Sequence, residues 1–162
     1  MEEMLKTLLL ERSVREFYQR YHAQLDQQML TQWPDFFTED ASYLVTNRAN
    51  FEEGMLVYNV FCEGKKMLID RALGLQKAVW FRDRLQRRFA GSIEITHQSE
   101  HALEVVSSFM VTESRQGEPS TLLLTSESQD SLSIAPDGTL QFSKRLCIID
   151  AEVLPDSIIY PI

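Results

Sequence analysis

The chain has 162 residues, of which 44% are hydrophobic and 25% are charged, and its formal net charge is −8. This length and composition fit one globular domain over residues 1–162 with a single hydrophobic core. An acidic chain is repelled by nucleic-acid phosphates and by anionic membrane surfaces, so neither is an expected partner. The longest apolar runs fall short of the roughly 18 residues that a membrane-spanning helix needs.

The first residues and the two cysteines favour a cytoplasmic protein. The stretch MEEMLKTLLLERSVREFY has acids where a secretory signal has bases, and Glu11 and Arg12 interrupt its apolar run. Cys62 and Cys147 lie far apart in apolar surroundings, which is typical of buried thiols in a reducing compartment. A disulfide between them is the alternative.

The first half of the sequence predicts mainly helices. Apolar residues recur at helical spacing over 5–25, with charged residues between them. Asp26 is expected to cap a second short helix over 26–33, which Pro34 would end. The next expected elements are a strand at 41–46, a polar loop at 47–54, a strand at 56–62 and a third helix over about 64–79.

From Ser92 onward the sequence predicts strands throughout. The alternating or β-branched segments are SIEITH, ALEVVSSFMVTES, TLLLTSESQDSLSI and LQFSKRLCIIDAEV. Short connections separate them, with turns at 116–119 and 136–138. Long antiparallel strands after a helical first half predict an α+β fold, with N-terminal helices packed on a strongly curved antiparallel or mixed sheet that encloses a cone.

The sequence shows no clear motif for binding a metal or a nucleotide. His97 and His101 have the spacing of two ligands on a helix, but their surroundings predict strand and loop, where this spacing does not converge. A Rieske cluster needs paired Cys and His motifs, and neither cysteine has a histidine at such spacing. The six scattered glycines form no phosphate-binding loop. We expect no cofactor site in this chain.

Asp40 is the candidate residue for acid–base chemistry. It lies beside Phe37 and Tyr43, and a carboxyl held against aromatic walls in a cone is suited to proton transfer. A stand-alone isomerase or dehydratase would use Asp40 with Tyr43 as a hydrogen-bond donor. The interpretation we favour places Asp35, Glu39 and Asp40 on the solvated side of a helix-to-strand corner.

The basic run RDRLQRR at 82–88 has two readings. It could receive an acidic partner surface or an anionic ligand, although a solvated loop or helix face is the more common role of such a run. The aromatic residues Trp33 and Trp80 are expected in the core.

Several motifs together resemble the small (beta) subunits of aromatic-ring-hydroxylating dioxygenases. The family element W-x-x-hydrophobic-Phe-Thr-x-Asp-x-x-Tyr-x-Val is matched by Trp33, Phe36, Phe37, Thr38, Asp40, Tyr43 and Val45. It continues with Asn47, Arg48, Asn50 and Gly54, and Asp70-Arg71 falls where the family has a helical Asp-Arg pair. The resemblance extends from about Phe17 to Asp150. The string WPDFFT and the short ends are most similar to terephthalate- and salicylate-type hydroxylases.

The sequence departs from the family in one region. Members often have an Arg-x-x-His element after the third helix, where this chain reads RDRLQRRFAG without a histidine. Any contact that this histidine makes is therefore absent or replaced.

The resemblance implies a cone-shaped fold like those of nuclear transport factor 2 and ketosteroid isomerase. It also implies a non-catalytic subunit, which self-associates as a trimer and supports large (alpha) subunits in a hetero-hexamer of three large and three small subunits. The Rieske [2Fe-2S] cluster and the mononuclear iron would lie in the large subunit, whose substrate would be an aromatic compound, most simply an aromatic carboxylate. Trp33, Arg48 and Arg71 are the expected subunit-interface residues. A ligand-binding adaptor without chemistry is a further alternative.

Overall fold

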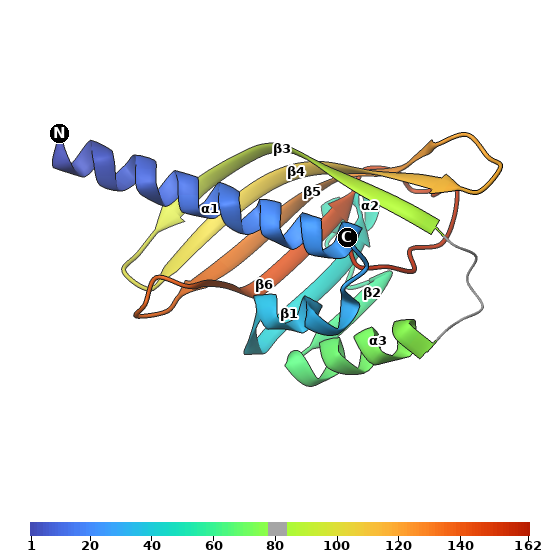
Figure 1. Cartoon of the computed structure of the whole chain (residues 1–162), viewed down its shortest axis with the longest axis horizontal. Helices are drawn as coiled ribbons and strands as arrows, with labels where there is room; N and C mark the ends of the chain where they lie inside the picture. The colour runs from blue at the N-terminus through green and yellow to red at the C-terminus, as the bar shows by residue number, and fades with distance from the viewer. Residues whose placement is uncertain (78–83) are drawn as a thin grey trace.

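The computed structural model describes residues 1–77 and 84–162, which form one six-stranded sheet in the order β2-β1-β6-β5-β4-β3 (Figure 1). The strands are β1 (Phe37–Asn47), β2 (Val60–Glu63), β3 (Arg84–Gln98), β4 (Ala102–Arg115), β5 (Thr121–Ile134) and β6 (Leu140–Ile149). The helices are α1 (Glu2–Asp26), the 3-10 helix η1 (Leu30–Phe36), α2 (Arg48–Glu52) and α3 (Lys65–Lys77). Strands β1 and β6 pair in parallel and the other neighbours are antiparallel. The predicted α+β fold with a mixed sheet is confirmed.

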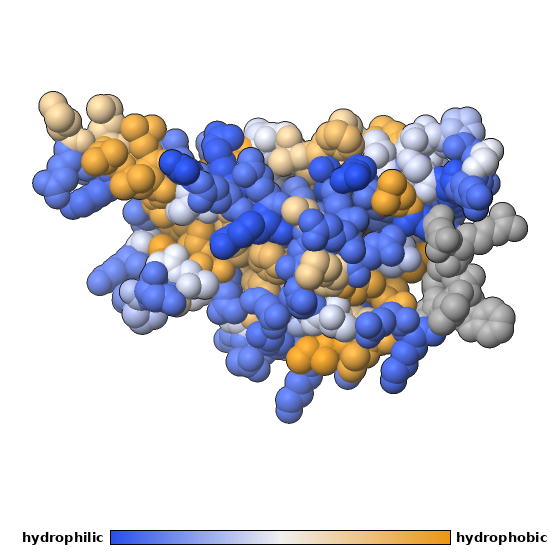
Figure 2. All heavy atoms as spheres, in the orientation of Figure 1, coloured by the Kyte–Doolittle hydropathy of each residue, from blue (hydrophilic) through white to orange (hydrophobic). Residues whose placement is uncertain are grey.

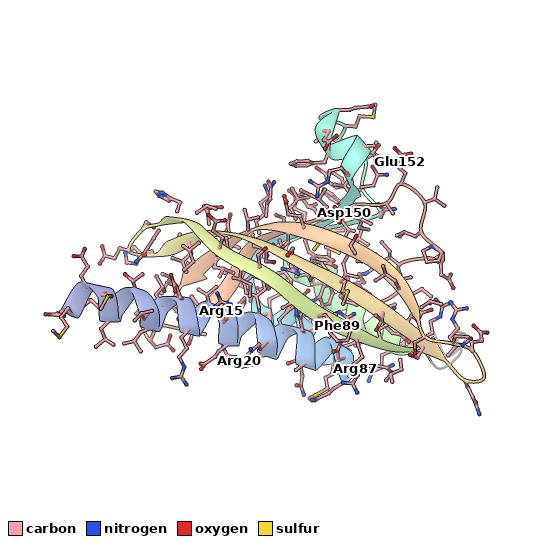
Figure 3. All side chains as sticks on the ribbon, turned by 90° about the horizontal axis from the view of Figure 1, so that it is seen from above. Arg15, Arg20, Arg87, Phe89, Asp150 and Glu152 are labelled. Carbon is pink, nitrogen blue, oxygen red and sulfur yellow. The ribbon has the colours of Figure 1, made fainter. Side chains whose placement is uncertain are left out.

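Helix α1 lies across one face of the curved sheet (Figures 1 and 3). Phe17, Tyr18 and Tyr21 are buried beneath it, because helical spacing places them on one side. The free end of α1 extends past the sheet and leaves Leu5 and Leu8 more than half exposed, as the apolar atoms at that end show (Figure 2). The helix therefore covers the sheet with its second half.

The sheet curves because its ladders contain irregularities. The register shifts between Ala90 and Ile93 in the β3–β4 ladder, and further shifts occur in the ladders of β4 with β5 and of β5 with β6. A bulge bends a strand and increases its twist. Gly91 lies at the first of these shifts, where a Cβ atom would collide with the Ser108 hydroxyl. A side chain at this position would therefore require the Ser108 side chain or the neighbouring backbone to shift.

The segment from Trp33 to Tyr43 is a packed corner between η1 and β1. Trp33, Phe37 and Tyr43 are fully buried, and their rings meet edge to face at centroid distances of 5.2–6.0 Å. The Trp33 indole nitrogen donates a hydrogen bond to the Tyr21 hydroxyl at 3.1 Å. Such aromatic pairs add stability beyond their buried area. The predicted helix-to-strand corner with a packed aromatic base is confirmed.

Three local predictions in the first half were wrong. Asp26 ends α1 rather than capping the next helix, which is a 3-10 helix that begins at Leu30. The expected loop at 47–54 contains α2, because the Asn47 side chain accepts a hydrogen bond from the Asn50 amide at 2.8 Å and caps the helix. The expected strand at 56–62 begins only at Val60.

The sequence predicts continuous strands only from Ser92, which is later than the structure shows. Strand β3 begins at Arg84, and its pattern is inverted: Gln86 and Arg88 are buried while Leu85 and Phe89 are half exposed. The basic run is therefore part of a strand with two polar side chains turned inward. Val79, Trp80 and the first two residues of the run lie outside the described residues.

The structure also tests the predictions for the cysteines and for membrane-spanning helices. Cys62 and Cys147 are buried free thiols, as expected. Within residues 1–77 and 84–162, none of the helices is long and apolar enough to cross a membrane.

Candidate functional site

The polar centre of the molecule is a buried ion pair between β6 and β5. Arg145 and Asp130 are 0% and 1% exposed, and Arg145 Nη1 lies 2.6 Å from Asp130 Oδ2. The same carboxylate oxygen accepts hydrogen bonds from the Tyr18 hydroxyl at 2.6 Å and from Ser128 at 2.7 Å. The pair thus joins α1 to the middle of the sheet.

Aromatic rings enclose the guanidinium group of Arg145. Its Cζ atom lies 4.8 Å from the ring centre of Tyr21, 5.0 Å from Phe142 and 5.4 Å from Phe109. Cation–π attraction is strongest where water is excluded. The rings and Asp130 together hold a positive charge at a depth where an isolated charge would be strongly destabilising.

Burial and neighbouring charges perturb several groups here. Burial raises the pKa of Asp130, while the positive charge of Arg145 and the hydrogen bonds from Tyr18 and Ser128 oppose that rise. Burial, together with the positive charges of Arg145 and Arg88, lowers the pKa of His22 to about 3. His22 is therefore neutral at physiological pH.

The position of Arg145 depends on an irregularity in β6. Ser131 pairs with Lys144 and Leu132 with Phe142, so that Ser143 is an extra residue in this strand. The irregularity lets Phe142 and Arg145, three residues apart, both be fully buried. Simple alternation could not identify Arg145 as a core residue, and no signal in the sequence marks this site.

The last residues of the chain close the interior. Ile162 is fully buried, and its main-chain oxygen accepts hydrogen bonds from the hydroxyls of Tyr21 at 3.1 Å and Tyr43 at 3.3 Å. Arg145 Nε donates to the same oxygen at 3.5 Å, and the Ile162 amide donates to the Tyr43 hydroxyl at 2.9 Å. The chain's own backbone therefore fills the space between α1 and the sheet.

A second buried ion pair lies nearer the surface. The Arg88 side chain is 0% exposed, its Nη1 lies 2.7 Å from Asp26 Oδ1, and its Nη2 donates to Gln86 and to the Pro161 carbonyl. Further out, Arg84 and Arg115 contact Glu113 and Asp156. In the described part of the basic run, Arg84 and Arg88 form ion pairs within the chain. The expectation that this run is a solvated loop or helix face was therefore wrong.

The structure does not bring Asp40 and Tyr43 together as an acid–base pair. Asp40 is exposed and accepts a hydrogen bond from Thr38 Oγ1 at 3.0 Å, whereas the buried Tyr43 hydroxyl contacts Ile162. A surface groove of about 450 Å³ lies between α1, η1 and β6, and neither residue lines it. The Asp40 side chain is exposed to solvent, as the favoured interpretation predicted.

The three expected interface residues lie in different environments. Trp33 is 0% exposed, so the expectation that it lies in the core is confirmed and its side chain is not available on the surface of this chain for a subunit interface. Arg71 Nη2 donates to the Ile159 carbonyl at 3.2 Å within the chain. The side chain of Arg48, the first residue of α2, is 31% exposed and forms an ion pair with Asp150 at 2.8 Å. Figure 3 labels Asp150 close to this helix. Arg48 and Arg71 are both partly exposed.

The donor groups of the described chain do not fit a Rieske cluster or a mononuclear iron. The structure places His97 and His101 on the exposed surface at the β3–β4 turn, and the Cys147 thiol points at the Ile162 oxygen. Across residues 1–77 and 84–162 no three His, Cys, Asp or Glu side chains form a metal-binding group. Both groups need several such ligands around one centre.

Comparison with known proteins confirms the resemblance noted in the sequence. Residues 22–156 match the family described as the ring hydroxylating beta subunit. The chain is 28% identical over 127 residues to the anthranilate 1,2-dioxygenase small subunit of Burkholderia cepacia, covering 78% of this chain and 79% of that protein. It is 27% identical over 146 residues to subunit beta 2 of the terephthalate 1,2-dioxygenase terminal oxygenase component of a Comamonas species, covering 90% of this chain and 94% of that subunit.

A solved structure agrees with these sequence matches. The crystal structure assigned to the beta subunit of an aromatic-ring-hydroxylating dioxygenase from Novosphingobium aromaticivorans superposes with a TM-score of 0.87 at 25% identity. The match covers 96% of this chain and 99% of that one. This chain belongs to the ring-hydroxylating beta subunit family.

Proposed function

We propose that this chain is the non-catalytic small subunit of a cytoplasmic Rieske non-heme iron oxygenase. Its role is to stabilise an assembly of large subunits, in a hetero-hexamer of three large and three small subunits. The Rieske [2Fe-2S] cluster and the mononuclear iron belong to the large subunit. The small subunit is a single domain over residues 1–162.

The observation that carries this proposal is the occupied interior of the cone. Ile162 and the rings of Tyr21 and Tyr43 fill the space where an enzyme of this shape would bind a substrate. Arg145 and Asp130 are committed to each other and to structural partners. These groups stabilise the fold, which is what a supporting subunit requires.

The proposed substrate class follows from the relatives. Two of them are subunits of enzymes named for anthranilate and terephthalate. Both names denote aromatic carboxylates, so we propose a substrate of this class for the oxygenase. The large subunit would select it, because the polar centre around Arg145 and Asp130 is buried and packed among the described residues.

A surface beside α2 fits a large-subunit contact. Met55, Leu56 and Val57 are 48%, 84% and 54% exposed and precede β2, and Arg48, the first residue of α2, forms a partly exposed ion pair with Asp150. We call these three apolar residues and Arg48 the α2 surface. Clustered exposed apolar side chains with a polar rim are typical of protein interfaces.

We expect Leu56→Glu to prevent co-purification with the large subunit. The side chain is 84% exposed, so the substitution leaves the fold intact but places a charge in the proposed apolar contact. The measurement is the yield of large subunit recovered with a tagged small subunit after co-expression, together with the melting temperature of the isolated variant. A loss of at least about tenfold is expected.

Leu122→Glu is the matched control. Leu122 is 53% exposed on β5 and undergoes the same change of charge outside the α2 surface. It should co-purify normally. Normal recovery with Leu56→Glu, or equal losses in both variants, contradicts the assignment of the interface to the α2 surface.

A further inference from the structure

The first turns of α1 have an apolar face that is turned away from the sheet of the same chain. The face that packs on the sheet runs through Val14 and Leu10. Helical spacing continues this face through Thr7 and Glu3, which are polar. Five apolar residues lie off it, and each is more than half exposed: Met1, Met4, Leu5, Leu8 and Leu9. We call these five residues the α1 end, and Figure 1 shows this part of the helix extending beyond the sheet.

A groove beside the second half of α1 has an apolar lining. The groove of about 450 Å³ between α1, η1 and β6 continues into a hollow of about 640 Å³ beside the β5–β6 turn, and Arg20, Ala23 and Leu140 line both. The buried Phe17 and the partly buried Phe36 also line the first part. We call the two hollows together the α1 groove.

The α1 end cannot fill the α1 groove of its own chain. Both belong to one continuous helix, and Ala23 lies 15 residues after Leu8, which is roughly 22 Å along the axis. An unbroken helix does not fold back on itself. An occupant of the groove must therefore come from another molecule.

The two surfaces match in length. The α1 end spans residues 1–9, which is about 13 Å of helix. The α1 groove follows the helix from Ser13 to Gln27, which is about 21 Å. An amphipathic helix that lays its apolar face in such a groove is a common mode of recognition. The groove therefore has room for the whole α1 end.

The charges of the two surfaces are complementary. Arg20 lines both hollows and forms no ion pair within residues 1–77 and 84–162, and the same is true of Glu3 in the first turn of α1. The remaining charged residues of the groove are acidic, namely Glu16, Asp35 and Asp137. Lys6 can face one of them, because its pair with Glu2 is exposed and therefore weak. Opposite charges on the two surfaces would set the direction of docking.

We propose that the α1 end of one copy of this chain docks in the α1 groove of a second copy. The contact joins two different surfaces, so each copy both provides an end and receives one, and a ring forms where the rotation closes. A ring of three copies rests on the proposed function, but the contact itself does not. It also lies apart from the α2 surface.

Leu8→Glu tests the α1 end. Its side chain is 54% exposed, so the fold is kept while a charge enters the apolar face. We expect the isolated native chain to form oligomers at about 100 μM, and the variant to associate at least about tenfold more weakly. Sedimentation velocity measures both. Leu122→Glu is the matched control, since Leu122 is 53% exposed outside both surfaces, and it should associate like the native chain.

Mixing two variants tests whether the groove is the acceptor. Ala23→Glu places a charge where the two hollows meet, so this variant alone should also be monomeric. It keeps an intact α1 end, and Leu8→Glu keeps an intact groove. An equimolar mixture should therefore form a dimer and stop there, because only one of the two possible contacts is intact. A mixture that remains monomeric overturns the proposal, as does a native chain that is monomeric at about 100 μM.

Co-expression with the large subunit separates this proposal from the proposed function. Leu8→Glu leaves the α2 surface unchanged, so it should recover the large subunit at the native yield. Loss of the large subunit with Leu8→Glu would assign the α1 end to that subunit and overturn the contact between copies. Failure of Leu56→Glu to reduce recovery would concern the α2 surface alone.

Discussion

Replacing Arg145 with methionine is expected to lower the free energy of unfolding by about 3–5 kcal/mol, because it leaves the Asp130 carboxylate buried without its positive partner. Both side chains are inaccessible to solvent, so water cannot compensate. The loss is comparable with the whole stability of a marginal domain. Urea unfolding followed by circular dichroism measures it.

The double variant Asp130→Asn with Arg145→Met separates the charge from the packing. It removes both charges and keeps two side chains of similar shape, so it should be more stable than Arg145→Met alone. Arg12→Met is the control for loss of an arginine, because Arg12 pairs with Glu16 on the exposed face of α1. The unfolding midpoint of this variant should equal that of the native chain. A double variant as unstable as the single one would show that Arg145 acts mainly through its aromatic contacts.

Acid should destabilise the protein through His22. Its pKa is lowered to about 3 by burial and by the charges of Arg145 and Arg88, whereas an unfolded histidine titrates near 6.5. Between these values the unfolded chain binds a proton that the folded chain does not, so stability falls as pH falls from about 6.5 to about 3. Relative to pH 7, this one group should lower the free energy of unfolding at pH 4 by about 3 kcal/mol.

The variant His22→Leu should lack this part of the acid loss. Urea unfolding at pH 7 and pH 4 gives the difference for the variant and for the native chain. His101→Leu controls for loss of an imidazole at an exposed position and should keep the native pH dependence. Equal acid losses in His22→Leu and the native chain would contradict the buried, neutral state of His22.

The main architecture could be predicted because local patterns and tertiary packing agree. The spacing of Phe17 and Tyr21 predicts a helix with one buried face, and both residues are buried under α1. The alternation over Ala41 to Val45 predicts β1, and the alternating Ala41, Tyr43 and Val45 are buried, although Thr46 beside them is buried as well. The long strands with Gly-containing turns predict the antiparallel part of the sheet.

Where polar residues face the core, sequence patterns fail. In β3, Gln86 and Arg88 are buried and Leu85 and Phe89 are exposed, so a rule that places apolar residues inside assigns this strand to a loop. In β6, an extra residue before Arg145 breaks the alternation. Partners from distant parts of the chain, Asp26 and Asp130, make these burials stable, and local sequence does not contain that information.

The filled cone depends on contacts between residues more than 100 positions apart. The hydroxyls of Tyr21 and Tyr43 contact Ile162. The segment after β6 has no periodic pattern, and the strand expected through residue 153 ends at Ile149. The candidate pair of Asp40 and Tyr43 came from nearness in sequence, but the fold exposes one and buries the other.

The most direct test of the subunit role is light scattering combined with iron analysis, on the chain alone and after co-expression with its large subunit. We expect the chain alone to be free of iron and inactive on aromatic carboxylates, and the co-expressed protein to be an iron-containing hetero-hexamer. Asp40→Asn in that complex should leave turnover unchanged, because Asp40 is exposed and bonded to Thr38. Stoichiometric iron in the isolated chain, or turnover by it that Asp40→Asn abolishes, would contradict the account.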